Sequence, residues 1–104
     1  MRYEVIVIPR VEKELRGIYE YIAFKLCAPK AASEQIKRLE NSINSLSNMP
    51  FRFKKYKMSQ YEERDIHTMI VDNFNVLYIP NKENGTVIII GVMYAGMDID
   101  RKFR

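Results

Sequence analysis

The sequence predicts an α+β domain in which a two-helix hairpin packs on one face of an antiparallel sheet, with the order β-α-α-β-β-β. Apolar residues recur at intervals of three and four over 11–22 and again over 32–46, as on one face of an α-helix. Three runs rich in β-branched residues follow, at 66–71, 74–79 and 86–94. A hairpin with one apolar face needs a cover in water, and these strands supply it.

The composition is that of one small globular domain, which we expect to span residues 1–104. Hydrophobic residues make up 47% of the chain, and no apolar run approaches the roughly 18 residues of a membrane span. The N-terminus lacks a secretory pattern and Cys27 is the single cysteine, so we expect a cytoplasmic protein without disulfides. We expect no cofactor, no metal and no membrane partner. The net charge of +4 permits contact with nucleic acid or an acidic protein without requiring either.

The first half of the chain predicts one strand and two helices. The strand covers 3–8, and the helices cover about 10–26 and 29–47. Pro29 is well placed at the first position of the second helix, because its missing N–H has no helical partner there. Gly17 lies inside the first helix, where glycine costs about 1 kcal/mol relative to alanine. We therefore expect the second helix to approach closely at Gly17.

The second half of the chain predicts a sheet of hairpins. Asp72-Asn73 separates the first two strand-like runs, and both residue types tolerate the left-handed backbone angles of a tight turn. Asn84-Gly85 ends the next connection and is also a hairpin signal. Residues 87–90 read Val-Ile-Ile-Ile and are apolar on both faces, which places the last strand in the middle of the sheet.

Several local patterns occur together, in one order, along nearly the whole chain. The first helix carries Leu-x-x-Ile-x-x-Tyr-Ile over 15–22, and the second helix opens at Pro29. A basic residue leads into a hairpin pattern over 66–78, and 92–98 forms a closing strand and its end. In this order the patterns resemble the RelE/ParE superfamily of toxins from bacterial type II toxin–antitoxin modules. The long helices are more similar to its ParE-like, plasmid-stabilisation branch.

The resemblance implies a growth-inhibiting toxin with a cognate antitoxin as its partner, either as a homodimer or as a hetero-oligomer with the antitoxin. Two modes of action fit the superfamily: a poison that binds a target such as DNA gyrase, and a metal-independent, ribosome-dependent endoribonuclease that cleaves mRNA. A homologue that keeps the fold but has lost toxicity is a third alternative. This chain has His67 and Met97 where the ribonucleases commonly have arginine, and each change removes a bidentate phosphate clamp. We therefore favour the binding poison.

If the chain is a ribonuclease, the resemblance and the residue chemistry give the catalytic group His67, Arg64, Lys55, Lys57 and Tyr94. His67 is the single histidine, and imidazole suits proton transfer from a 2′-hydroxyl on an exposed sheet face. The basic side chains would hold the scissile phosphate, and Tyr94 would contact the substrate. The structural alternative for His67 is a half-buried strand histidine beside Arg64. For the basic loop after Pro50, the alternative is that Phe51 and Phe53 anchor it to the core while its lysines face water.

Two further groups of residues are candidates for protein contacts. For a binding poison, the basic tail residues Arg101, Lys102 and Arg104 would contact the target. Tyr19 and Phe24 lie off the apolar stripe of the first helix. As exposed aromatic anchors they would bind the antitoxin, and the alternative is that they complete the core.

Overall fold

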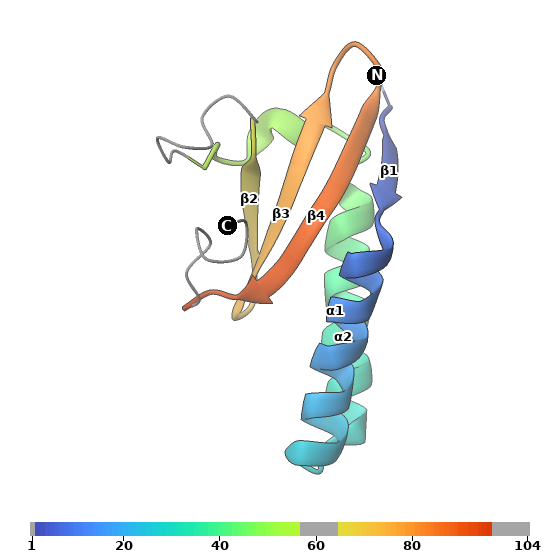
Figure 1. The fold of residues 1–104 in the computed structure, drawn as a ribbon, viewed down its shortest axis with the longest axis vertical. Coiled ribbons are helices and arrows are strands. Elements are labelled where there is room, and N and C mark those ends of the chain that lie inside the picture. The colour runs from blue at the N-terminus through green and yellow to red at the C-terminus, as the bar shows by residue number, and fades with distance from the viewer. Residues whose placement is uncertain (1, 57–64, 97–104) are drawn as a thin grey trace.

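In the computed structural model, which describes residues 2–56 and 65–96, the chain forms two helices and four strands in the predicted order (Figure 1). Two short turns of other helix types are added to that order. In chain order the elements are β1 (Glu4–Val7), α1 (Pro9–Glu20), the π-helical turn η1 (Tyr21–Lys25), α2 (Pro29–Ser45), the 3-10 turn η2 (Pro50–Arg52), β2 (His67–Val71), β3 (Phe74–Asn81) and β4 (Thr86–Tyr94). Within the described ranges, no helix is long and apolar enough to span a membrane.

The sheet has the strand order β1-β4-β3-β2, so β4 lies between two neighbours as predicted. The pairs β2–β3 and β3–β4 are antiparallel, whereas β1 runs parallel to β4, with Val5 opposite Val87. The sheet is therefore mixed rather than wholly antiparallel, within the fold class that was predicted. Parallel neighbours need a long crossover, and the helical hairpin with β2 and β3 supplies one.

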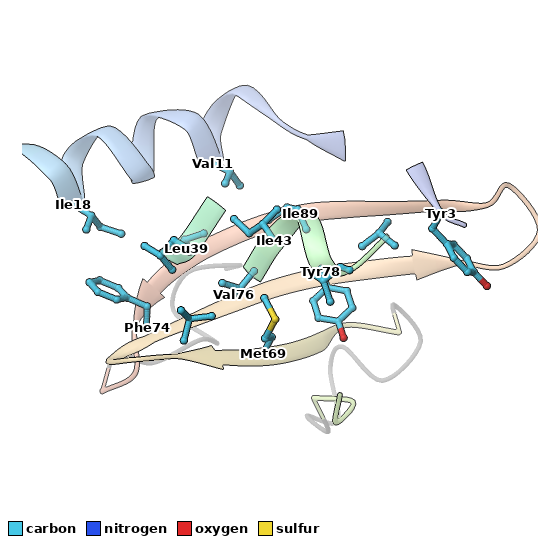
Figure 2. Close-up of a cluster of buried hydrophobic side chains, with 14 residues drawn as sticks. Tyr3, Val11, Ile18, Leu39, Ile43, Met69, Phe74, Val76, Tyr78 and Ile89 are labelled. Carbon is cyan, nitrogen blue, oxygen red and sulfur yellow. The ribbon is translucent and has the colours of Figure 1, made fainter. Parts of the chain in front are cut away.

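The apolar stripes of both helices face the sheet, as their periodicity predicted. Val11 and Ile18 of α1 are buried, as are Leu39 and Ile43 of α2. In Figure 2 these side chains meet those of the strands, with Ile18 and Leu39 close to Phe74. The core therefore lies between the hairpin and one face of the sheet. Both helices also run on past the end of the sheet (Figure 1).

Pro29 lies in the first turn of α2, as predicted. The expectation for Gly17 was wrong, because a Cβ atom built on Gly17 would meet nothing within 4 Å. Gly17 directly precedes Ile18 and is therefore turned by about 100° around the helix axis from this core residue, at a position exposed to solvent. The packing of α2 against α1 therefore does not explain this glycine.

The free edge of β4 is satisfied by side chains from α1. β1 ends at Val7, whereas β4 continues past Ile90, where its register with β3 shifts by one residue. Beyond that point Arg10 Nη2 donates to the Ile90 carbonyl at 2.7 Å, and the Val92 N–H donates to Glu14 Oε1 at 3.0 Å. These bonds pair backbone groups of β4 that β1 does not reach. They also hold α1 against the sheet.

The turn between β2 and β3 is tied to α2. Asp72 has a φ of 54°, the left-handed angle that the sequence predicted for this turn. Its carboxylate accepts hydrogen bonds from Arg38 Nε at 2.8 Å and from Gln35 Nε2 at 3.0 Å. The bond from Arg38, followed by that from Gln35, lowers the pKa of Asp72.

Candidate functional site

His67 opens β2 on the side of the sheet that faces the core, not on an exposed face. Its side chain is buried, with 6% of the residue surface exposed, and it lies on the same face of the strand as buried Met69. The imidazole stacks on the ring of Tyr78, with ring centres 5.6 Å apart, and meets the edge of Phe51 at 5.8 Å. His67 is therefore packed among aromatic rings, and the expectation of an exposed catalytic histidine is corrected.

Both ring nitrogens of His67 are engaged. Nδ1 lies 2.8 Å from the carbonyl oxygen of Phe53, and Nε2 lies 3.2 Å from Asp65 Oδ1. The same carboxylate oxygen lies 3.6 Å from Lys55 Nζ. An incoming hydroxyl could reach the imidazole only by displacing one of these partners. The arrangement indicates that His67 links β2 to the preceding loop through structural hydrogen bonds, rather than transferring protons.

The segment 53–56 continues the sheet beyond the outer edge of β2. The N–H of Tyr56 donates to the carbonyl of Ile66 at 2.6 Å, and the N–H of Thr68 donates to the carbonyl of Lys54 at 3.0 Å. His67 joins this segment from the core side. These bonds hold the segment alongside β2, although its sequence lacks the alternation of apolar and polar residues that would predict a strand.

Tyr94 lies at the other end of the sheet from His67. It pairs with Phe74 across β3 and β4, and the two rings are 4.7 Å apart. His67 pairs with Tyr78, four residues further along β3, which corresponds to roughly 13 Å of strand. The structure therefore does not bring these two predicted catalytic side chains together.

Arg52, in the loop that follows α2, ties this loop to the end of the helix. Its guanidinium donates to the carbonyls of Asn48 and Met49 and to Ser45 Oγ, and it lies 4.7 Å from the ring centre of Phe53. Asn48 and Met49 follow the end of α2, so these bonds hold the turn between α2 and η2 in place. The structural alternative for this part of the loop is therefore supported, since Arg52 and Phe53 hold it to the domain.

Tyr78, whose ring stacks on His67, also holds the loop after α2 to the sheet. Its hydroxyl donates to the carbonyl of Pro50 at 2.7 Å, and burial raises its pKa to about 12.

Replacing Tyr78 with phenylalanine should leave the buried Pro50 carbonyl unpaired and lower the free energy of unfolding by about 1–3 kcal/mol. Urea denaturation would measure the change. The matched control is Tyr21→Phe, since Tyr21 is 46% exposed, and equal losses for both variants would contradict this role.

A second candidate surface lies at the far end of the helical hairpin, beyond the sheet. Phe24 is 71% exposed and Leu26 is 56% exposed, while Tyr19 is half-buried. The predicted partner-binding pair is thus split, with Phe24 free for contact and Tyr19 partly packed. Leu26 was missed because it lies four residues after Ile22 and so continues the apolar stripe, which predicts a buried side chain. We call Tyr21, Phe24 and Leu26 the hairpin tip.

Some predicted site residues lie outside the described residues, namely Lys57, Arg64, Arg101, Lys102 and Arg104. Met97, the position compared with the arginine of ribonucleases, also lies outside them. Among residues 2–56 and 65–96, no group of three or more histidine, cysteine, aspartate or glutamate side chains could hold a metal ion.

The family model described as the ParE toxin of the type II toxin–antitoxin system, parDE, matches residues 5–99. The chain belongs to the ParE toxin family. No curated protein sequence matches this ParE family member. The match to the family model confirms the resemblance to the RelE/ParE superfamily that was inferred from sequence patterns.

Solved structures agree on the fold of this ParE family member. A chain of the chromosomal ParDE toxin–antitoxin system from P. aeruginosa matches with a TM-score of 0.72 at 12% identity, over 89% of this chain and 96% of that one. A chain of the RelBE2 toxin–antitoxin complex from Mycobacterium tuberculosis matches with a TM-score of 0.63 at 19% identity, over 90% and 99%. Free E. coli RelE, in a mutant form, matches with a TM-score of 0.63 at 18% identity, over 92% and 86%. At these identities the likeness concerns the fold alone.

Proposed function

We propose that this ParE family toxin stops growth in the cytoplasm by binding an essential protein such as DNA gyrase, rather than by cleaving mRNA. One observation carries the proposal. His67, the single histidine, is buried with both ring nitrogens engaged by Phe53 and Asp65.

Cleavage by attack of a 2′-hydroxyl needs a base, a cation on the phosphate and an acid at the leaving oxygen, all within reach of one another. Within the described residues, Lys55 is the predicted cation beside His67, and it pairs with Asp65 at 3.6 Å. Tyr94 stands at the opposite end of the sheet. This separation argues against an assembled ribonuclease centre, whereas a poison that acts by binding needs none.

The proposed partner in the resting state is a cognate antitoxin that covers the hairpin tip. Structural neighbours include a toxin–antitoxin complex from M. tuberculosis and an archaeal RelE–RelB complex from Pyrococcus horikoshii. Large apolar side chains are exposed together at the hairpin tip, which is typical of a surface that contacts another protein, and aromatic residues are common anchors of such interfaces. The half-buried Tyr19 would contribute a smaller part of the contact.

Replacing Phe24 with alanine should therefore weaken antitoxin binding by at least about tenfold, as truncation of an interface anchor commonly does. Thermal stability should hardly change, because Phe24 is 71% exposed in the free chain. Calorimetric titration with the product of an adjacent small gene would measure the affinity. Phe51→Ala is the control, since Phe51 is also an exposed phenylalanine but lies in η2. An antitoxin that binds both variants like the natural chain would move the interface away from the hairpin tip.

The mode of action is tested by inducing the protein in cells and following DNA and protein synthesis separately. A gyrase-type poison should stop DNA synthesis first, with mRNA intact. Arrest of protein synthesis before any change in DNA synthesis, with cleaved mRNA, would overturn the proposal. Growth that continues at full induction would instead indicate a chain that has lost toxicity.

A further inference from the structure

Met49, shortly after the end of α2, disfavours the fold in two ways. It has a φ of 48° and a ψ of 55°, left-handed backbone angles that residues with a side chain rarely adopt because they crowd the Cβ atom. Its side chain is also 72% exposed, so burial does not offset this strain. Residues held at such angles are concentrated at functional sites. Met49 therefore marks a candidate contact surface.

The neighbours of Met49 are fixed in place and add an aromatic ring and a positive charge. Phe51 is 45% exposed, and its ring makes edge contacts with Tyr3 and His67, at 6.2 and 5.8 Å between ring centres. The guanidinium of Arg52 donates to the Met49 carbonyl at 3.1 Å. Side chains that are already ordered in the free protein lose little entropy when a partner binds. We call Met49, Phe51 and Arg52 the Met49 patch.

The charge around the Met49 patch is positive. The sequence from 41 to 61 contains no aspartate or glutamate but four basic residues, Arg52, Lys54, Lys55 and Lys57. Lys54 is exposed, and the carboxylate of Asp65, which contacts this loop, is already paired with Lys55. An acidic protein surface with an apolar pocket therefore complements the Met49 patch in both charge and hydrophobicity.

The Met49 patch and the hairpin tip lie at opposite ends of α2. This helix spans 17 residues, from Pro29 to Ser45, which corresponds to about 25 Å (Figure 1). The two exposed apolar surfaces are therefore separate, and a contact at the hairpin tip does not by itself cover the Met49 patch.

We propose that the Met49 patch binds the protein target of this toxin, through an acidic surface of the target that receives Met49 and Phe51. The inference rests on the proposed function, because it names the part of the toxin that contacts the target. A methionine side chain adapts to the shape of an apolar pocket, while Phe51 and Arg52 supply fixed contacts beside it. The strained backbone at Met49 is then explained, since glycine would relieve the strain and remove the contact.

Growth arrest by the full-length chain, expressed without antitoxin, tests the proposal. Met49→Gly should raise the amount of folded toxin needed for half-maximal arrest by about tenfold or more, as the loss of an interface anchor commonly does. The same variant should keep or raise the thermal midpoint, because glycine adopts a φ of 48° without strain. Its affinity for the antitoxin should stay within about twofold of that of the natural chain.

The matched control is Phe24→Ala at the hairpin tip, which should weaken antitoxin binding and keep full growth arrest. A Met49→Gly variant that arrests growth like the natural chain would overturn the proposal. If Met49→Gly instead loses affinity for the antitoxin, the patch belongs to the antitoxin, and the proposal is again wrong. A natural chain that does not arrest growth would overturn the proposed function itself, and this inference with it.

Charge reversal tests the acidic character of the partner separately. Lys54→Glu should weaken growth arrest by about tenfold, whereas Lys54→Arg should retain it, since only the first variant changes the sign of the charge. The control is Lys30→Glu, an exposed lysine at the other end of α2, which should leave growth arrest unchanged. Equal effects of Lys54→Glu and Lys30→Glu would contradict an acidic partner at the Met49 patch.

Discussion

Replacement of Leu39 with alanine should lower the free energy of unfolding by about 2–5 kcal/mol, as it does for buried leucines whose surroundings cannot collapse. Leu39 has no exposed surface and lies in the core cluster between α2 and the sheet, near Ile18 and Phe74 (Figure 2). Removing its side chain leaves a cavity that helices on one side and strands on the other hold open. Urea denaturation with a fixed slope would give the difference directly.

The neighbouring Glu40 provides the control for this prediction. It follows Leu39 on α2 but is exposed, so Glu40→Ala should change the free energy of unfolding by no more than about 0.5 kcal/mol. Equal denaturation midpoints for the natural chain and the Leu39 variant would contradict the packing of the hairpin on the sheet.

Replacing His67 with alanine should weaken the fold without abolishing growth arrest. The change removes the ring stacked on Tyr78 and the bond to the Phe53 carbonyl, and it leaves Asp65 with Lys55 alone. We expect a loss of about 1–3 kcal/mol, the usual cost of leaving a buried hydrogen-bonding group without its partner. Growth arrest, normalised to the amount of folded protein, should stay within about twofold, a small effect beside that of losing a general base.

The matched control for His67→Ala is Tyr78→Phe, which weakens the same cluster and keeps the imidazole. If His67 were the general base of a ribonuclease, its removal would lower cleavage by about 100-fold or more, whereas Tyr78→Phe would not. Loss of growth arrest in the histidine variant alone, at equal folded protein, would therefore restore the ribonuclease mechanism.

Most of the architecture could be predicted because it depends on local period and local stops. The stripes of α1 and α2 gave both helices and their buried faces, and Pro29 gave the start of α2. The doubly apolar run 87–90 placed β4 in the middle of the sheet. The direction of β1 relative to β4 could not be predicted, because an alternating strand has the same pattern whether its neighbour is parallel or antiparallel.

The site was harder to predict because it depends on register. A strand pattern fixes which residues alternate but not which set faces the core, and a shift of one residue would move His67 to the other face. Here Ile66 and His67 are both buried, so burial did not follow simple alternation. The distance between His67 and Tyr94 likewise follows from the pairing of β2, β3 and β4, which no local motif encodes.

The central claim, that this ParE family toxin acts by binding and not by cutting RNA, can be tested with the purified full-length chain in two assays in parallel. One assay follows DNA supercoiling by gyrase, and the other follows the length of mRNA on translating ribosomes. The account predicts that the chain inhibits supercoiling in proportion to its concentration and leaves the mRNA intact. Cleaved mRNA on ribosomes, with supercoiling unaffected at the same concentrations, would contradict it.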